Sequence, residues 1–257
     1  MSKADIILLL ILAVGLVVFF LSPKALLITT GRYGQGKEED NKVVNSIFGE
    51  EYAKERFELY FQWYNVVHEI GHGIIFSNGN YRPKIVDEEQ LVNDFAIAFW
   101  EYYGEEDKFS ELEDTVKYAL ENIRRPVDKD ISHMDYAREN WGKKEFFTFN
   151  NYGWFQFSCV ENSLSKKRTL EEVLDEMGVR NIKVQPQKIL VYQTIDENTT
   201  TKIIADVVTI LHEWNVEFPN IYHKFSDDPN VNMIQQKRNI LRVLDLFYKK
   251  INVEKNL

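Results

Sequence analysis

FELYFQWYNVVHEIGHGIIF, residues 57 to 76, is the stretch that decides the fold of this 257-residue chain. Its apolar residues recur at the three- and four-residue spacing of one helix face, and the same pattern begins upstream at Glu50. The next four residues, SNGN, contain an Asn-Gly pair, which is typical of a turn. The sequence therefore predicts a long helix over residues 50 to 76, followed by a reversal of the chain.

Two histidines, His68 and His72, stand four residues apart near the end of this helix, with Glu69 between them. Residues at this spacing project from one helix face, so both imidazoles can bind one tetrahedral ion. Glu69 is displaced around the helix and reaches a water beside the ion more easily than the ion itself, which is typical of a general base. The pattern arises by chance about once in a hundred chains of this length, so it needs support from a further ligand.

A second helical pattern runs from Asp87 to Tyr103, with acidic residues at its start and Gly104 at its end. Glu89, in its first turn, follows His72 by 17 residues. An antiparallel return would bring this carboxylate to the two imidazoles. The sequence therefore predicts a set of two histidines and one glutamate with a fourth position left for water, as in catalytic zinc sites.

Two other acidic residues of the same helix, Asp94 and Glu101, are alternatives for the third ligand. On an ideal helix Asp94 points about 140 degrees away from Glu89, and Glu101 lies about three turns further on. Asn93 is one turn beyond Glu89 on the same stripe, where a group that orients a ligand histidine is expected. Glu89 is the ligand that we predict.

Residues 89 to 96 read EQLVNDFA. Together with the histidine motif they resemble gluzincin-type metallopeptidases, and more closely a group of uncharacterised zinc peptidases whose second signature is Glu-x-x-x-Asp-x-Phe-Ala. The resemblance spans about residues 64 to 100 and implies a zincin-like helical domain. It also implies a role for each motif residue: zinc ligation by His68, His72 and Glu89, base catalysis by Glu69, and support of a histidine by Asn93. The family has Asp at this last position, so the amide accepts a hydrogen bond here but adds no negative charge.

The rest of the chain predicts a mainly α fold with few strands. Strand patterns occur at Gln187 to Thr194 and at Glu145 to Phe149. Further helical patterns occur at residues 108 to 122, 131 to 140, 168 to 177, 199 to 216 and 231 to 251. There is no internal repeat, phosphate-binding glycine loop or nucleophile elbow, which argues against nucleotide-binding and serine-hydrolase functions.

The amino-terminal segment is set apart by its composition. Residues 6 to 21 read IILLLILAVGLVVFFL, without a charge or a proline. With its neighbours this run is long enough to cross a bilayer, and it has no polar face that a buried core helix would show. A signal peptide is the alternative, but no small-x-small cleavage site precedes Pro23. We expect a membrane anchor.

This segment gives a domain plan in three parts. Residues 1 to 24 form the anchor or signal segment, residues 25 to 41 form a linker with turn-forming glycines and a charge run, and residues 42 to 257 form the metallopeptidase domain. The flanking lysines and arginines do not fix the orientation. We expect the domain on the extracytoplasmic side, or secreted if the segment is cleaved.

Composition excludes several classes of partner and site. The net charge is −9 with both signs interspersed, which argues against binding to nucleic acid. Cys159 is the single cysteine, so there is neither an internal disulfide nor a cysteine metal site. Any metal must therefore be bound by histidine or carboxylate side chains.

Hydrolysis of an amide bond needs a donor to the carbonyl oxygen as it gains negative charge. The chain offers His133, Tyr152, His212 and His223, and their spacing selects none of them. The aromatic stretch from Asn150 to Phe157 around Tyr152 is interpreted as core, although it could also line a cleft.

The prediction from sequence is therefore zinc-dependent hydrolysis of a peptide bond close to a membrane. The alternative is an inactive zincin-like protein that serves as a binding or scaffold module there. Another amide or cell-wall peptide as substrate would use the same chemistry. Intramembrane proteolysis is disfavoured, because the helix of the motif carries charges at Lys54, Glu55 and Arg56.

Overall fold

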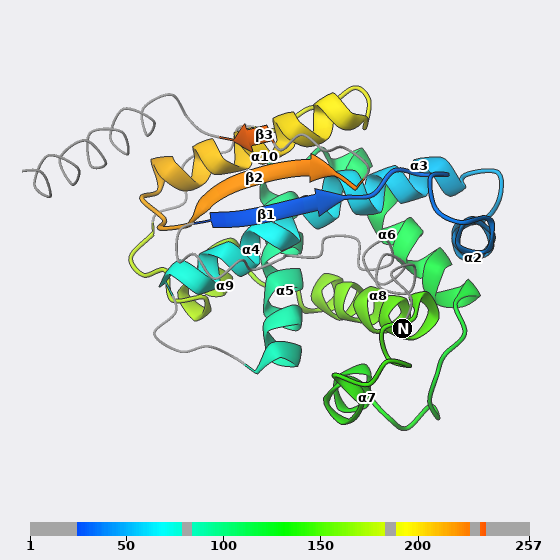
Figure 1. Cartoon of the computed structure of the whole chain (residues 1–257). Helices are drawn as coiled ribbons and strands as arrows, with labels where there is room; N and C mark the ends of the chain where they lie inside the picture. Colours follow the sequence, from blue (N-terminus) through cyan, green and yellow to red (C-terminus); the bar gives the residue numbers. More distant parts are fainter. Residues whose placement is uncertain (1–24, 79–83, 183–188, 227–231, 235–257) are drawn as a thin grey trace, which may run out of the picture.

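The computed structural model describes residues 25–78, 84–182, 189–226 and 232–234. This part of the chain is mainly helical, as predicted, with a small three-stranded sheet (Figure 1). The elements in chain order are β1 (Ala25–Thr30), α2 (Glu38–Phe48), α3 (Ala53–Glu58), the π-helix η1 (Leu59–Tyr64), α4 (Asn65–Asn78), α5 (Ile85–Tyr103), α6 (Glu106–Asn122), α7 (His133–Asn140), α8 (Phe149–Lys166), α9 (Leu170–Glu176), α10 (Glu197–Glu213), β2 (Asn220–Phe225) and β3 (Asn232–Ile234).

The predicted membrane anchor, residues 1 to 24, lies outside the described residues, and so does the carboxy-terminal stretch from residue 235. Within the described part of the chain, no helix combines the length and the apolar character that a bilayer span requires. The anchor therefore stays a prediction.

The predicted helix over residues 50 to 76 runs through three consecutive elements, α3, η1 and α4. In η1 the turns are wider, and at its end the N–H of Asn65 bonds to the carbonyl of Tyr60, five residues back. All six side chains of η1 are buried, and Trp63 stacks on Trp100 of α5 with ring centroids 3.9 Å apart. This packing fixes the start of α4, which carries the histidine motif.

Two glycines let α4 pack closely against neighbours on opposite sides. A Cβ on Gly71 would lie 3.1 Å from Val92 and Phe95 of α5, and a Cβ on Gly73 would lie 3.1 Å from Leu26 of β1. These glycines point about 200 degrees apart around the helix. Helix α4 therefore lies between the sheet and α5, as Figure 1 shows.

The sheet joins the two ends of the described chain and corrects the predicted linker at residues 25 to 41. Strand β1 pairs in parallel with β2 over its full length, and β2 pairs antiparallel with β3. Leu26, Ile28 and Thr30 of β1 are buried in alternation, as in a strand with one face on the core. The charge run from Glu38 to Asp40 forms the first turn of α2, where the helix dipole favours acidic side chains.

The two strand predictions, at Gln187 to Thr194 and at Glu145 to Phe149, are wrong for the residues that the structure describes. Phe149 begins α8, because the side chain of Thr148 accepts a hydrogen bond from the N–H of Asn151 and caps the helix. Residues 189–192 are not part of the sheet, although the N–H of Leu190 bonds to the carbonyl of Tyr103. The predicted helix at 231 to 251 is contradicted at its start, where residues 232–234 are β3, and its remainder lies outside the described residues.

Helix α8 packs against α5 and runs crosswise to it in the view of Figure 1. Trp154, Phe155 and Phe157 of α8 are buried, which agrees with the interpretation of this aromatic stretch as core. The same helix brings the polar residues Tyr152 and Gln156 toward the first turns of α5.

Candidate metal centre

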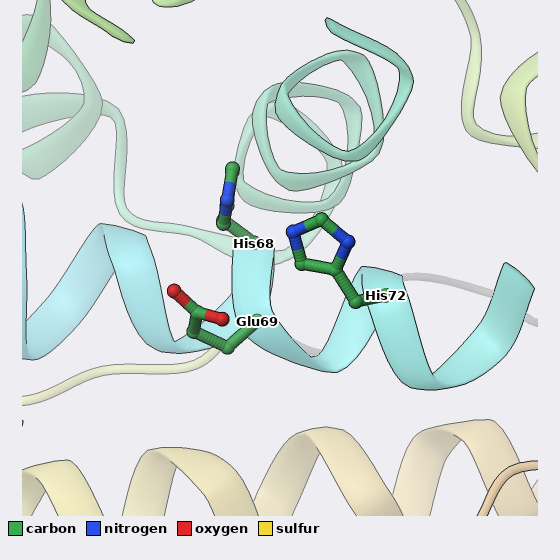
Figure 2. A group of neighbouring side chains, drawn as sticks. All are labelled: His68, Glu69 and His72. Carbon is green, nitrogen blue, oxygen red and sulfur yellow. The ribbon is translucent and has the colours of Figure 1, made fainter. Parts of the chain in front are cut away.

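His68 and His72 lie on one side of α4 with their rings 5.1 Å apart between centroids. Figure 2 shows both imidazoles beside the carboxylate of Glu69. The three residues are 3%, 6% and 3% exposed, respectively. One ligand atom from each lies within 4.8 Å of those of the other two, so this buried group could hold a metal ion.

The predicted third ligand, Glu89 of α5, faces the same two imidazoles. Its Oε2 lies 3.5 Å from Nε2 of His68, and its Oε1 lies 3.9 Å from Nε2 of His72. Both distances are long for hydrogen bonds. Two ligand atoms that bind one tetrahedral zinc ion at about 2.0–2.1 Å lie roughly 3.3 Å apart. The spacing is therefore closer to that of ligands around an ion than to that of hydrogen-bonded partners.

The other nitrogen of each imidazole is held by an acceptor on α5. Nδ1 of His68 lies 3.1 Å from Oδ1 of Asn93, and Nδ1 of His72 lies 2.8 Å from Oε1 of Glu88. Each Nδ1 therefore carries the proton that it donates, so in the neutral imidazoles that bind a metal the Nε2 lone pairs are directed at Glu89. Two lone pairs and a carboxylate then face one another without a proton between them.

Asn93 is fixed as an acceptor toward His68 by its other contacts. Its Nδ2 donates to the carbonyl oxygen of Glu89 and to Oε1 of Gln156, at 2.8 and 3.2 Å. Its Oδ1 also accepts a hydrogen bond from the hydroxyl of Tyr64 at 2.6 Å. An aspartate could not make the two donations, which is a physical reason for asparagine here. The negative charge is instead behind the other imidazole, on Glu88.

The carboxylate of Glu69 is oriented by a hydrogen bond to one of its two oxygens. Its Oε1 accepts a hydrogen bond from Nδ2 of Asn65 at 3.0 Å, whereas its Oε2 is buried and has no hydrogen-bond partner within the described part of the chain. Burial raises the pKa of Glu69 to about 8, against the opposing charge of His72. A buried acceptor without a donor points to a group that is absent from this set of side chains.

The charges of the site act on one another strongly. Burial opposes a charge on His72, but the hydrogen bond to Glu88 and the nearby carboxylates together raise its pKa to about 9. Burial lowers the pKa of His68. Burial also opposes the charge on Glu89, but the contacts with both histidines lower its pKa. In the absence of a metal, protonated His72 is the cation that these carboxylates share.

A divalent cation fits this set of residues. Three carboxylates, from Glu69, Glu88 and Glu89, meet two imidazoles, and among the described residues no lysine or arginine pairs with them. Such a concentration of negative charge and lone pairs in a buried place is stabilised by a metal ion. The donor set, two nitrogens and one carboxylate with an unpaired Glu69 oxygen beside it, suits zinc.

The alternative ligands from the sequence lie elsewhere. Glu101 is exposed, and Asp94 is bound by side chains of the α8–α9 region on another face of α5. His133 contacts Gln90, and His223 is buried against Thr30 of β1.

Residues of the site that were missed in the sequence include Glu88, Gln156 and Asn65, which holds Glu69. Glu88 directly precedes the predicted ligand, and its position in the acidic first turn of α5 was the available signal. Gln156 donates to Oε2 of Glu89 at 2.7 Å from a helix far along the chain, and no local pattern marks it.

Compared with models of known protein families, with curated proteins and with solved structures, the chain matches none. The geometry of the site is therefore the basis on which a function is proposed.

Proposed function

We propose that this chain is a zinc-dependent peptidase that is anchored to a membrane by its amino-terminal segment. The observation that carries the proposal is the convergence of Glu89 on Nε2 of His68 and of His72, at 3.5 and 3.9 Å, beside the unpaired oxygen of Glu69. His68, His72 and Glu89 would hold the ion. Three protein ligands leave a position open for substrate, which separates a catalytic zinc site from a closed structural one.

The chemistry that zinc supplies when bound is Lewis acidity, which makes water a better nucleophile and a carbonyl group a better electrophile. The chain supplies the proton transfers. Oε2 of Glu69 accepts the proton from the attacking water and returns it to the amine nitrogen as the amide bond breaks. Asn65 holds the other oxygen of this carboxylate, so the accepting oxygen keeps its direction.

Residues that do not contact substrate have a supporting role in this proposal. Asn93 and Glu88 hold the imidazoles in the tautomer that binds metal through Nε2, and Gln156 holds Glu89. The close approach of α5 at Gly71 brings these groups to the histidines. The site is therefore organised before substrate arrives.

The test uses the purified full-length chain loaded with zinc and a quenched-fluorescence peptide library. We expect about one zinc per chain by elemental analysis, and cleavage that falls at least about a thousandfold in Glu69→Gln while the zinc content is unchanged. The matched control is Glu55→Gln, an exposed glutamate of α3, which should leave cleavage unchanged.

Cleavage that survives in Glu69→Gln would contradict the assigned base. Zinc binding by the wild-type chain without cleavage of any peptide in the library would favour the alternative, a zinc-containing binding or scaffold protein.

A further inference from the structure

Tyr152, in the first turn of α8, is tied to the candidate metal ligand Glu89 through one amide group. Nε2 of Gln156 donates to the hydroxyl oxygen of Tyr152 at 2.8 Å and to Oε2 of Glu89 at 2.7 Å. The two protons of this nitrogen therefore hold the phenol and the carboxylate side by side. The hydroxyl itself donates to no other group among the described residues, so its proton is available for a hydrogen bond.

The electrostatics of the site keep that proton on Tyr152. The pKa of this phenol is well above its ordinary value, mainly because the phenol is buried and secondly because of the charge of Glu89. The charge of Glu69 acts in the same direction, so the hydroxyl lies in the field of both the ligand carboxylate and the proposed base. The phenol is thus a neutral donor beside the place where an amide would react.

The ring of Tyr152 is held in place by its aromatic neighbours. Its centroid lies between 5.8 and 6.3 Å from those of Phe146, Phe147, Phe155 and Trp141. Such edge and tilted contacts restrict the orientation of a ring. A donor that is fixed in advance stabilises developing charge more strongly than one that must reorganise.

The three histidines that the sequence leaves as alternatives do not share these properties. Nε2 of His133 is directed to Oε1 of Gln90, and the ring of His212 packs on Phe218. His223 is a residue of strand β2, and its side chain is buried against Thr30 of β1. The charged groups that shift the pKa values of His133 and His223 do not include Glu89 or Glu69. The pKa of His212 is lowered by burial. Tyr152 is the candidate that a hydrogen-bonded side chain, Gln156, connects to Glu89.

We infer that the hydroxyl of Tyr152 donates a hydrogen bond to the carbonyl oxygen of the scissile amide as that oxygen gains negative charge. The inference rests on the proposed function and names its oxyanion donor. Gln156 is a positioning residue in this assignment, because it holds Tyr152 and Glu89 without contacting the reacting atoms. The proton of Tyr152 is shared in the hydrogen bond and stays on the phenol, so no further acid or base is needed.

The test compares Tyr152→Phe with wild type in the zinc-loaded, full-length chain. Removal of the hydroxyl should lower kcat for peptide cleavage about a hundredfold, with KM within about threefold, because the bond forms mainly in the transition state. The second readout is calorimetric binding of acetohydroxamate, a small zinc-chelating anion with a carbonyl oxygen. Its affinity should fall about tenfold, whereas the Kd for zinc should stay within about twofold.

Tyr136→Phe is the matched control, since Tyr136 belongs to the same aromatic cluster and no carboxylate of the site acts on its pKa. This variant should match wild type in both readouts. Equal acetohydroxamate affinity in Tyr152→Phe and wild type would overturn the inference, and so would failure of the zinc-loaded wild type to bind the probe. If no peptide is cleaved but Tyr152→Phe still weakens the probe, the donor assignment is supported and the peptidase proposal fails.

Discussion

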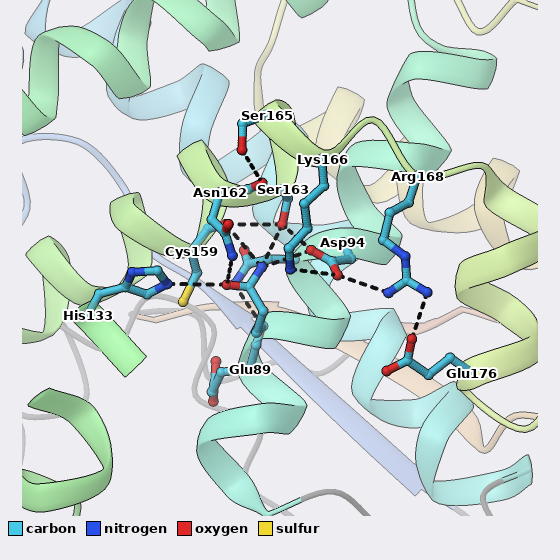
Figure 3. Close-up of polar contacts among 12 residues, drawn as sticks. Glu89, Asp94, His133, Cys159, Asn162, Ser163, Ser165, Lys166, Arg168 and Glu176 are labelled. Carbon is cyan, nitrogen blue, oxygen red and sulfur yellow. Dashed lines mark hydrogen bonds and ion pairs between the residues drawn. The ribbon is translucent and has the colours of Figure 1, made fainter. Parts of the chain in front are cut away.

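Helix α5 carries two buried carboxylates, Glu89 and Asp94, in opposite chemical situations (Figure 3). Asp94 is surrounded by donors: Gln90, Ser163, Arg168 and Lys166 all direct N–H or O–H groups to it. Among the residues that the structure describes, Gln156 is the one side chain that donates a hydrogen bond to Glu89, which otherwise faces the two imidazoles at 3.5 and 3.9 Å.

The difference separates a carboxylate with structural partners from one that we propose as a metal ligand. A buried charge with a full set of donors joins secondary-structure elements, here α5 to α8 and α9. A buried charge with few donors depends on a cation beside it, here protonated His72 or a metal ion. Burial alone does not distinguish the two, because Glu89 is 7% exposed and Asp94 is 4% exposed. The partners do.

The largest effect should come from removal of one carboxylate at a time. Glu89→Ala should weaken zinc binding on the order of a thousandfold, about 4 kcal/mol, because a ligand is lost. Asp94→Asn should leave zinc binding within about threefold. Competition titration against a zinc chelator measures both. An equal loss of affinity in the two variants would erase the contrast between them.

In the absence of metal, Asp94→Asn should lower the stability of the fold more than Glu89→Ala does. Asp94→Asn should lower the free energy of unfolding by about 3 kcal/mol, since Arg168 and Lys166 lose their buried partner and are only 25% and 38% exposed. Glu89→Ala should lower it by less, because protonated His72 keeps its hydrogen bond to Glu88 when the Glu89 carboxylate is removed. Urea denaturation measures both. Asp135→Asn, in an exposed ion pair with Arg138, is the control that should show no measurable change.

His223 extends the comparison to a buried group that is stable only when neutral. It is fully buried near Thr30 and Thr201, and burial lowers its pKa to about 4, from the ordinary value of 6.5. The unfolded chain therefore binds a proton between pH 6.5 and 4 that the folded chain does not. Stability should be full above pH 6.5 and should fall by about 2 to 3 kcal/mol toward pH 4.

His223→Gln should lose this part of the pH dependence, which shows as a smaller drop in free energy of unfolding between pH 7 and 4 than in wild type. Parallel curves for the two proteins would show that His223 is charged in the folded state.

The smallest effect should come from changing a residue that holds a ligand histidine by a hydrogen bond. Glu88→Gln should weaken zinc binding about tenfold, roughly 1.4 kcal/mol, because the amide still accepts from Nδ1 of His72 but adds no charge. Asp87→Asn is the matched control on the neighbouring position, where the carboxylate pairs with Arg138 at 2.7 Å. If the two variants lose affinity equally, the effect is that of general charge on α5.

The parts of the molecule that the sequence predicts well are those encoded locally. The mainly helical class and helices α5, α6 and α10 follow from apolar spacing within a single segment. The pairing of the predicted ligands is also local, since Glu89 follows His72 by only 17 positions. The close contact of α4 with α5 at Gly71 brings the two residues together.

The parts that sequence patterns missed depend on contacts between distant segments. Strand β1 is stabilised by pairing with β2, at the other end of the described chain. Because that partner is distant in the sequence, the short apolar segment of β1 was interpreted as part of a linker. The tie between Gln156 and Glu89 requires α8 to pack on α5. The same packing selects Tyr152 from four candidate donors that their spacing leaves equal.

The central claim is that one zinc ion occupies the space between two imidazoles and Glu89. Anomalous diffraction at the zinc absorption edge, from crystals of the zinc-loaded chain, tests it most directly. The account predicts one peak within about 2.0–2.2 Å of Nε2 of His68, Nε2 of His72 and an oxygen of Glu89. A peak on the Nδ1 atoms, a peak bound by Glu69 in place of Glu89, or no peak between the rings would contradict it.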